Sequence, residues 1–323
     1  MSELQNVFSW SHSAAKDFET CRRMRYWDKY AKWGGWSRTA TQLQKDAYRL
    51  GKMDTRFNLQ GQAAEQAAMW MLRRAQRGEP PDPDEAWEKV AKPWLRQHWD
   101  QSLHQEWKTD PKKCCLHEHY YPQFTQGTDK ERIVAVAGTV KTCLKNFAEI
   151  FLPRFAGIRP EDEIPVAVIG SGGDPESFTF EGVKIYAIPD YVHVQDGVWH
   201  IHDWKSGRAR DEHHDQLAIY ALWAVEKHGV PPEKIRVLIE YLGSGETVAA
   251  DMTSERVDVI RQHIRESVLD MAEYLVDADI HKNRPLPREE WELTTDRRTC
   301  ARCKFFELCA PELAEEIDGS ESE

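Results

Sequence analysis

The chain contains no apolar run of about 18 residues, so we expect no membrane-spanning helix. Its first residues, MSELQNVFSWSHS, lack the basic start and the apolar stretch of a secretory signal. We therefore expect a cytoplasmic protein, in a compartment where disulfides are rare. No Gly-x-x-x-x-Gly-Lys-Ser/Thr loop is present, which argues against an ATP-driven motor of that kind. Positive charge is also in deficit, since the formal net charge is −11.

The charge that is present is distributed unevenly. Residues 311–323 carry six acids and no base, whereas residues 16–38 hold seven bases against three acids and residues 282–304 hold seven against four. Because local basic patches guide a polyanion, the two basic segments are a candidate DNA track, with solvated helix faces as the alternative. The length of 323 residues suits one elaborated domain. We expect it to span residues 1–310, followed by an acidic, disordered tail at 311–323.

Periodicity indicates helices first and a sheet later. Helical patterns occupy residues 13–33, 40–79, 85–108 and 133–151, with Ser11 or Ser13 as the first cap. β-rich patterns follow at 164–170, 177–194 and 198–206, and then come a helix at 211–228, a strand at 234–244 and a long helix at 253–280. The order predicts an α/β fold: a central mixed sheet flanked by helices, with an N-terminal helical elaboration at about 31–130.

The dipeptide Asp-Gly at 196–197 lies between two β-rich runs and predicts a two-residue hairpin turn. Such a turn pairs Gln195 with Val198. Counting back along the ladder then places Asp190 directly opposite Asp203, with their Cβ atoms about 4.5–5.5 Å apart. Two carboxylates are therefore expected to face each other across the hairpin.

Like charges in directly opposite positions destabilise a sheet, and a divalent cation would offset that repulsion. Two carboxylates with water molecules are the ligands that Mg²⁺ or Mn²⁺ prefers. Lys205 lies two residues beyond Asp203 on the same face, where it could orient a water or stabilise charge on a phosphate. The alternative is a structural ion-pair cluster, because the same acid-x-Lys triplet also occurs at 106–108 and 110–112.

Two motifs carry a resemblance to a known family. Ile-Pro-Asp at 188–190 followed by Asp-Trp-Lys at 203–205 resembles the core of the PD-(D/E)XK nuclease superfamily. Gln216 and Tyr220, four residues apart on one helix face, resemble the Gln-x-x-x-Tyr motif of its RecB-like branch. The resemblance implies a restriction-endonuclease-like core. It also implies that Asp190, Asp203 and the Trp204 carbonyl hold metal, and that Lys205, Gln216 and Tyr220 complete the catalytic site.

One position departs from the family pattern. Many relatives carry a histidine on the early helix, in a pattern such as Gly-x-x-x-His, and here GQAAEQA places Glu65 at that position. Glutamate is a competent metal ligand, so the resemblance implies Glu65 as a further ligand. A solvated helix glutamate is the alternative.

The cysteines form a second pattern, in which one distant cysteine accompanies a C-terminal group. The members are Cys21 and the spacing Cys300-x₂-Cys303-x₅-Cys309. Four thiolates suit either an iron–sulfur cluster or zinc. Together with the nuclease motifs, the pattern resembles the [4Fe–4S] site of AddB-type and CRISPR-adaptation-type nucleases, which implies a cluster joining the chain ends. Cys114, Cys115 and Cys143 have no such pattern and are expected to be unligated or core thiols.

These motifs predict a Mg²⁺- or Mn²⁺-dependent deoxyribonuclease, an exonuclease that prefers single-stranded DNA. Recombination, repair, phage DNA processing and CRISPR adaptation are the expected settings, with DNA as partner, alone or beside a separate helicase or recombination protein, and no membrane. The alternative is a non-catalytic iron–sulfur subunit that binds DNA within a helicase–nuclease or recombination complex. A zinc-stapled module without nuclease activity is a further alternative.

Overall fold

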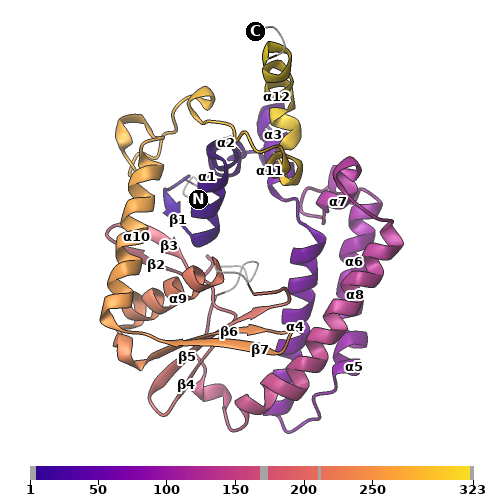
Figure 1. The fold of residues 1–323 in the computed structure, drawn as a ribbon, viewed down its shortest axis with the longest axis vertical. Helices are drawn as coiled ribbons and strands as arrows, with labels where there is room; N and C mark the ends of the chain where they lie inside the picture. Colours follow the sequence, from indigo (N-terminus) through magenta and orange to yellow (C-terminus); the bar gives the residue numbers. More distant parts are fainter. Residues whose placement is uncertain (1–4, 168–173, 210–211, 321–323) are drawn as a thin grey trace.

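The computed structural model describes residues 5–167, 174–209 and 212–320, which form two mixed sheets flanked by helices (Figure 1). The smaller sheet has the order β1-β3-β2 and the larger has the order β4-β5-β6-β7. Their strands are β1 (Ser9–Trp10), β2 (Ser177–Phe180), β3 (Val183–Tyr186), β4 (Tyr191–Gln195), β5 (Val198–Lys205), β6 (Ile235–Tyr241) and β7 (Glu246–Asp251). The α/β class is as expected, but the single central sheet is wrong.

The division between the sheets falls at residues 187–190, Ala-Ile-Pro-Asp, where the chain leaves β3 and enters β4. Pro189 has no N–H to donate to a ladder, so it interrupts the β-rich run that the sequence presents as continuous. The strand expected at 164–170 is also wrong over residues 164–167, which lie outside the strands, and its last three residues lie outside the described part of the chain.

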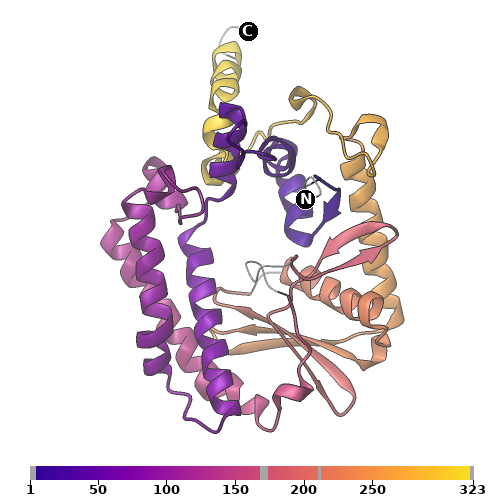
Figure 2. The ribbon, with the colours of Figure 1, turned by 180° about the vertical axis from the view of Figure 1, so that it is seen from behind.

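Helices cover both faces of the larger sheet. On one face lie α9 (Glu212–His228) and α10 (Ser254–Ala272), which bury Leu222 and Ile264 in a core shared with Ile201 and Ile239. On the other side, α4 (Arg56–Gln76), α6 (Lys92–Leu103) and α8 (Asp129–Asn146) stand together, as Figure 2 shows from behind. The helix expected at 253–280 ends at Ala272, before a turn in which Asp277 has a φ of 61°.

The helical elaboration expected at about 31–130 corresponds to a set of helices between the first helices and α8. Besides α4 and α6 it contains α3 (Gln42–Gly51), α5 (Pro83–Ala86) and α7 (His117–Tyr120). π-Helical turns lie at Trp27–Ala31, Trp87–Ala91 and Phe147–Phe151. Shorter 3₁₀ turns lie at Glu106–Lys108, Pro122–Phe124, Leu152–Phe155, Pro160–Asp162, Pro232–Lys234, Val276–Ala278 and Arg288–Glu290.

The first expected helix, at 13–33, is broken at Cys21. Ser11 caps α1 (His12–Thr20) by accepting a hydrogen bond from the Ala14 amide, and α2 (Arg22–Tyr26) follows. Between the two helices Cys21 is extended, with φ −163° and ψ 115°. The break turns this cysteine out of the helical path and towards the C-terminal segment.

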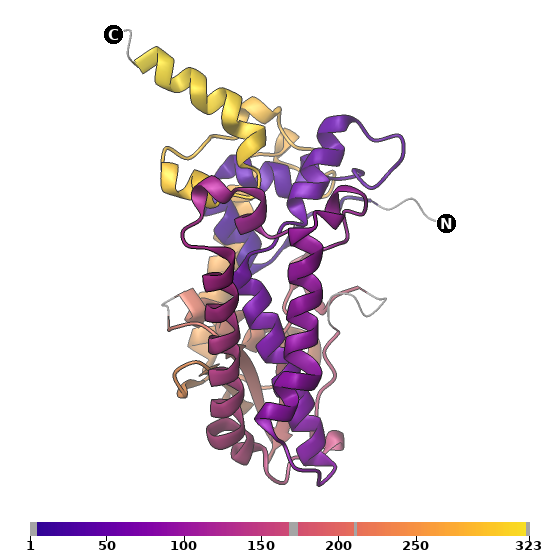
Figure 3. The same ribbon diagram turned by 90° about the vertical axis from the view of Figure 1, so that its right-hand side faces the viewer.

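Helix α2, near the N-terminus, lies beside the C-terminal segment in the upper part of Figure 1, where the Arg23 Nη1 is 2.8 Å from Glu312. The C-terminal segment contains α11 (Arg297–Arg302) and α12 (Phe306–Ser320), and α12 extends away from the body in Figure 3. The disordered tail expected at 311–323 is therefore helical as far as Ser320. Leu313 is buried, and Ala, Leu and Glu are strong helix formers, which accounts for the difference. Within the described residues, no helix combines the length and apolar character that crossing a bilayer requires.

Candidate active site

The hairpin between β4 and β5 has the register that the Asp-Gly turn predicts. Asp196 and Gly197 both have positive φ, 52° and 74°, as a two-residue turn of this kind requires. The pairs run from Gln195↔Val198 to Tyr191↔His202. The predicted register is confirmed over these pairs. The next residue, Asp190, lies beyond the ladder and donates its amide to the His202 carbonyl at 3.2 Å, so its predicted pairing with Asp203 is not part of the ladder. The charge of Asp203 nevertheless acts on Asp190, which places the two carboxylates near each other.

Asp190 is held further by the strand that faces it. Its Oδ2 accepts a hydrogen bond of 2.6 Å from the Trp204 amide. The N–H and C=O groups of one strand residue point to the same side of the strand, so the Trp204 carbonyl leaves β5 on the side of Asp190. β4 begins only at Tyr191, and the preceding Pro189 has no amide to pair there.

Asp203 belongs to a closed ring of polar contacts. Its Oδ2 lies 2.7 Å from the Lys205 Nζ, and the Lys205 Nζ donates to the Gln216 Oε1 at 3.0 Å. The Gln216 Nε2 donates to the Tyr220 hydroxyl at 2.7 Å, and that hydroxyl donates to the Asp203 Oδ1 at 3.4 Å. Asp203 is only 2% exposed, so the ring holds a buried carboxylate and its lysine in fixed positions. Helix α9 thus brings the predicted Gln-x-x-x-Tyr pair to the predicted strand.

Glu65 on α4 lies in the electrostatic field of the same group. Burial raises its pKa, the charge of Asp203 raises it further, and Lys205 acts in the opposite direction. For Asp190, burial followed by the charges of Asp203 and Glu65 raises the pKa well above its usual range. Three carboxylates and one ammonium group therefore share one partly buried site, and added positive charge would stabilise the ionised carboxylates.

Helix α4 reaches this site through contacts that the motifs do not reveal. The Gln60 Nε2 donates to the Ser206 Oγ at 3.2 Å, immediately after β5 ends. Gly61 faces the same hydroxyl, and a Cβ at this position would lie 3.6 Å from it. The helix therefore passes the end of β5 closely, one turn before Glu65. Gln60 and Ser206 lie 146 residues apart, and no local pattern in the sequence relates them.

The carboxylates do not form a compact ligand set. Among residues 5–167, 174–209 and 212–320, no three His, Cys, Asp or Glu side chains are arranged to hold one metal ion. Mg²⁺, however, commonly keeps several waters and is held by only one or two protein carboxylates. Asp190 and Asp203 are two carboxylates close enough for the charge of one to raise the pKa of the other.

A family comparison covers nearly the whole chain. The model of the PD-(D/E)XK nuclease superfamily matches residues 9–310, from β1 to the first turn of α12. The chain belongs to the PD-(D/E)XK nuclease superfamily. Its members are usually metal-dependent nucleases that act on DNA with Mg²⁺ or Mn²⁺. A search of the curated proteins found no significant match.

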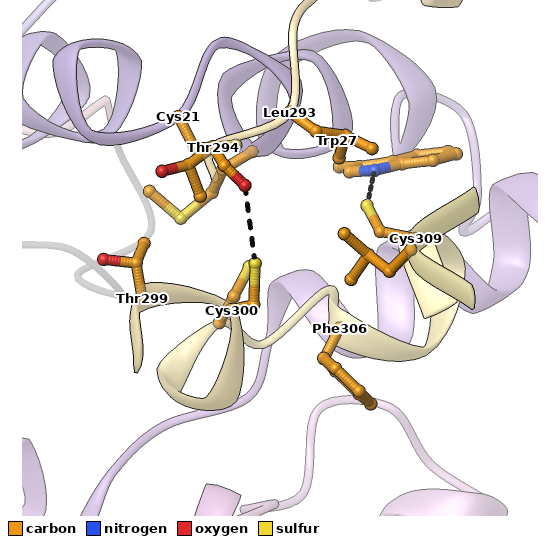
Figure 4. Close-up of a pocket in the computed structure, with 11 residues that line it drawn as sticks. Cys21, Trp27, Leu293, Thr294, Thr299, Cys300, Phe306 and Cys309 are labelled. Carbon is orange, nitrogen blue, oxygen red and sulfur yellow. Dashed lines mark hydrogen bonds between the residues drawn. The ribbon is translucent and has the colours of Figure 1, made fainter. Parts of the chain in front are cut away.

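In this member of the PD-(D/E)XK superfamily, one cysteine near the N-terminus and three near the C-terminus line one pocket (Figure 4). They are Cys21, Cys300, Cys303 and Cys309, and Met24, Trp27 and Leu313 are among the apolar residues beside them. The Trp27 Nε1 donates to the Cys309 Sγ at 3.2 Å, and the Phe305 amide donates to the Cys303 Sγ at 3.4 Å. Burial raises the pKa of Cys303 to about 12 and that of Cys309 to about 11. The remaining cysteines, Cys114, Cys115 and Cys143, do not line this pocket.

Three bases of the expected DNA track are engaged in ion pairs. Arg23 is 4% exposed, and its Nη1 lies 2.8 Å from Glu312. Asp28 binds Lys32 at 2.9 Å and Lys304 at 2.8 Å. Bases that cluster in the sequence thus form internal ion pairs between the two chain ends, so the prediction of a basic surface at 16–38 and 282–304 is wrong for these residues.

Proposed function

We propose that the protein is a Mg²⁺- or Mn²⁺-dependent deoxyribonuclease of the RecB-like branch, which hydrolyses phosphodiester bonds as an exonuclease with a preference for single strands. The observation that carries the proposal is the closed ring of Asp203, Lys205, Gln216 and Tyr220, with Asp190 held nearby on the Trp204 amide. A surface salt bridge needs neither the second carboxylate nor the support from Gln216 and Tyr220. A site that concentrates negative charge beside one held lysine suits a metal-bound phosphate.

The residues divide into ligands and supporting groups. Asp190, Asp203 and the Trp204 carbonyl would hold the cation, with Glu65 adding a carboxylate from α4. When bound, Mg²⁺ or Mn²⁺ activates a water and stabilises charge on the phosphate. Lys205 orients the attacking water or stabilises a phosphate oxygen, since its ammonium group is fixed at the edge of the carboxylates.

Gln216 and Tyr220 keep the lysine in place. The Gln216 Oε1 accepts from Lys205, while the Gln216 Nε2 donates to Tyr220, so the amide has its orientation set from both ends. Tyr220 is buried, and burial raises its pKa well above the usual range, so the phenol stays protonated and donates to Asp203. Helix α9 therefore couples the position of Lys205 to that of Asp203.

We further propose that Cys21, Cys300, Cys303 and Cys309 hold a [4Fe–4S] cluster. Four thiols around one apolar pocket fit such a group, and N–H donors to two of the sulfurs are features that tune iron–sulfur centres. Among the described residues, no three cysteines are close enough together to bind a single ion such as zinc. In a [4Fe–4S] cluster each cysteine binds a different iron, so the thiols can stand further apart. The cluster would join α1–α2 to α11–α12, since its ligands come from both chain ends.

The preference for single strands is supported by an exposed aromatic group next to α3. Trp36 is 47% exposed, and its ring lies 5.0 Å from Trp33 and 5.8 Å from Tyr48. The Lys52 Nζ lies 5.4 Å from the centre of the Tyr48 ring. Exposed rings beside a cation are a platform on which unpaired bases stack without regard to sequence.

Incubation with end-labelled single- and double-stranded DNA in Mn²⁺ tests the activity directly. The wild type should shorten the single strand, and Lys205→Ala should not. Lys112→Ala is the matched control, because Asp110-Pro111-Lys112 repeats the acid-x-Lys spacing on an exposed turn away from the site. Tight DNA binding without cleavage by the wild type would reject the nuclease and favour the non-catalytic iron–sulfur subunit.

A further inference from the structure

The two residues that flank Asp203 share one buried acceptor on the opposite face of the sheet. Trp204 and His202 both point away from Asp203, because side chains alternate along β5. The Glu240 Oε2 accepts a hydrogen bond of 2.7 Å from the Trp204 Nε1 and lies 3.1 Å from the His202 Nδ1. Glu240 stands on β6 directly beside Trp204 in the parallel ladder, and it is fully buried.

The same two flanking residues hold Asp190 through their backbone. The His202 carbonyl accepts the Asp190 amide at 3.2 Å, and the Trp204 amide donates to the Asp190 Oδ2 at 2.6 Å. Asp190 precedes β4, so these two contacts replace the ladder pairing that a strand residue would have. The position of Asp190 therefore depends on where β5 places His202 and Trp204.

Burial of the Glu240 carboxylate costs free energy, because one of its oxygens is poorly paired. Its Oε1 makes no hydrogen bond among the described residues, and the Arg154 Nη1 is 3.9 Å away. Phe155 and Tyr191 pack around His202, which leaves the carboxylate in a largely aromatic environment. Where a buried charge only fills space, an apolar residue of similar volume is as stable or more so. The two hydrogen bonds to Oε2 are thus what this carboxylate contributes.

We propose that Glu240 is a positioning residue for the nuclease site. It fixes the His202 and Trp204 side chains from behind the sheet, and so fixes the two peptide groups of β5 that hold Asp190 near Asp203. Glu240 touches neither substrate nor the reacting atoms, and it acts only through β5. This inference rests on the proposed function, since the spacing of the carboxylates matters because they bind the cation.

Glu240→Leu removes the acceptor and keeps an apolar side chain of similar size. It leaves the Trp204 N–H without a buried partner, so β5 can shift relative to Asp190. We expect Mn²⁺ affinity to fall by about tenfold to a hundredfold, as is usual when the partners of ligating residues are removed. The kcat should fall with it, while the KM for DNA should change little, because the DNA-contacting surface is unaltered.

Glu240→Gln is the conservative variant. Its amide oxygen, in the place of Oε2, can accept from both the Trp204 Nε1 and the His202 Nδ1–H, as the carboxylate oxygen does. This variant should keep Mn²⁺ affinity within a few-fold of the wild type. Trp204→Phe removes the indole N–H together with the five-membered ring, and it keeps a six-membered ring in the core and leaves the contact of Glu240 with His202 in place. It should therefore show a smaller loss of Mn²⁺ affinity than Glu240→Leu.

Glu163→Leu is the matched control, because it deletes a carboxylate from the same side of the sheet. Glu163 accepts from the Tyr191 hydroxyl at 2.9 Å and from Arg73, and it has no hydrogen bond to His202 or Trp204 among those that the structure describes. If Glu240 acts only on stability, both leucine variants will lose melting temperature and keep Mn²⁺ affinity. If Glu240 positions the site, only Glu240→Leu will lose affinity.

The measurement is Mn²⁺ titration calorimetry on whole protein, at a temperature where circular dichroism shows each variant folded. Unchanged affinity in Glu240→Leu overturns the inference; if that variant does not fold, unchanged affinity in Trp204→Phe does so. Equal losses in Glu240→Gln and Glu240→Leu also overturn it. Asp203→Ala distinguishes failure of the proposed metal site from failure of the role of Glu240. If the wild type binds Mn²⁺ no better than Asp203→Ala, the proposed metal site is wrong. If Asp203→Ala loses Mn²⁺ affinity and Glu240→Leu does not, only the role of Glu240 is wrong.

Discussion

Asp203 and Lys205 lie side by side on β5, and their different chemistry predicts different defects. Asp203→Ala should weaken Mn²⁺ binding, because it leaves Asp190 alone. Lys205→Ala should keep most of that binding, since a cation is no metal ligand and its removal relieves repulsion of the metal. Both variants should lose cleavage. Calorimetry with Mn²⁺, followed by cleavage of labelled single-stranded DNA, checks both expectations.

A different outcome is expected if Asp203 and Lys205 form only a structural ion pair. If this buried pair were only structural, breaking it would cost about 3–5 kcal/mol of stability but leave cleavage intact in the protein that still folds. Full activity in Asp203→Ala or Lys205→Ala would therefore remove the hairpin from the active site. Both variants should retain iron, because the cysteine pocket is built from other segments.

For single residues, the sequence predicts contacts that follow from strand register or from spacing along one helix. The turn at 196–197 fixes which residues face each other along the hairpin, and the four-residue spacing places Gln216 and Tyr220 on one face of α9. It does not reveal Gln60 or Glu240. Their contacts to Ser206 and Trp204 span 146 and 36 residues and depend on how separate elements pack.

At the scale of elements, the sequence predicts a strand only where its β pattern is strong. The strands β2 to β6 carry strong β-branched and aromatic patterns and were expected. In contrast, β1 has two residues and β7, Glu-Thr-Val-Ala-Ala-Asp, has a weak pattern, so neither was recognised. The basic segment at 16–38 misled in another way, because a pattern of charge in the sequence does not show which charges will find internal partners.

The aromatic group before α3 gives a prediction at the scale of an element. Trp36→Ala should weaken single-stranded DNA binding by about 1–3 kcal/mol, the usual contribution of one base stacked on an aromatic ring. Double-stranded DNA, whose bases are already stacked, should be affected far less. Fluorescence anisotropy with matched oligonucleotides at one fixed salt concentration measures both affinities.

Leu43→Ala is the control for Trp36→Ala. Leu43 is 48% exposed on α3 and offers apolar surface without a ring, so its loss should leave both affinities unchanged. Equal weakening by the two changes would indicate a general apolar contact. No weakening by Trp36→Ala would exclude base stacking at this place.

Across the whole molecule, the meeting of the chain ends depends on ion pairs as well as on cysteines. Burial tends to raise the pKa of Asp28, but Lys304 and Lys32 outweigh it and hold the pKa well below the ordinary value of 3.8. The stabilisation is therefore fully present above pH 3.8 and is lost as the pH falls towards the lower pKa of the folded state. Asp28→Asn, which leaves two lysines without their partner, should cost about 3 kcal/mol at neutral pH.

Denaturant unfolding of wild type and Asp28→Asn between pH 7 and pH 3 tests this linkage. The difference in unfolding free energy should stay constant down to about pH 4 and shrink below it, because the carboxylate of the unfolded wild-type chain then takes up a proton while that of the folded chain stays ionised. Asp258→Asn, in an exposed pair with Arg261, should change stability little at any pH. A difference that grows on acidification would contradict the role of Asp28.

The proposed cluster makes the last whole-molecule prediction, because its ligands close a loop that spans nearly the entire chain. Purified without oxygen, the wild type should be brown and carry about four irons per chain. Cys21→Ala should lose iron and melting temperature together, since the remaining thiols all belong to one short C-terminal segment and metal binding contributes to folding. Cys143→Ala, a buried cysteine outside the pocket, should keep its iron. Elemental analysis and thermal unfolding measure the iron content and the melting temperature of each variant. Colourless wild-type protein with one zinc per chain would show that the site holds a structural zinc and no cluster.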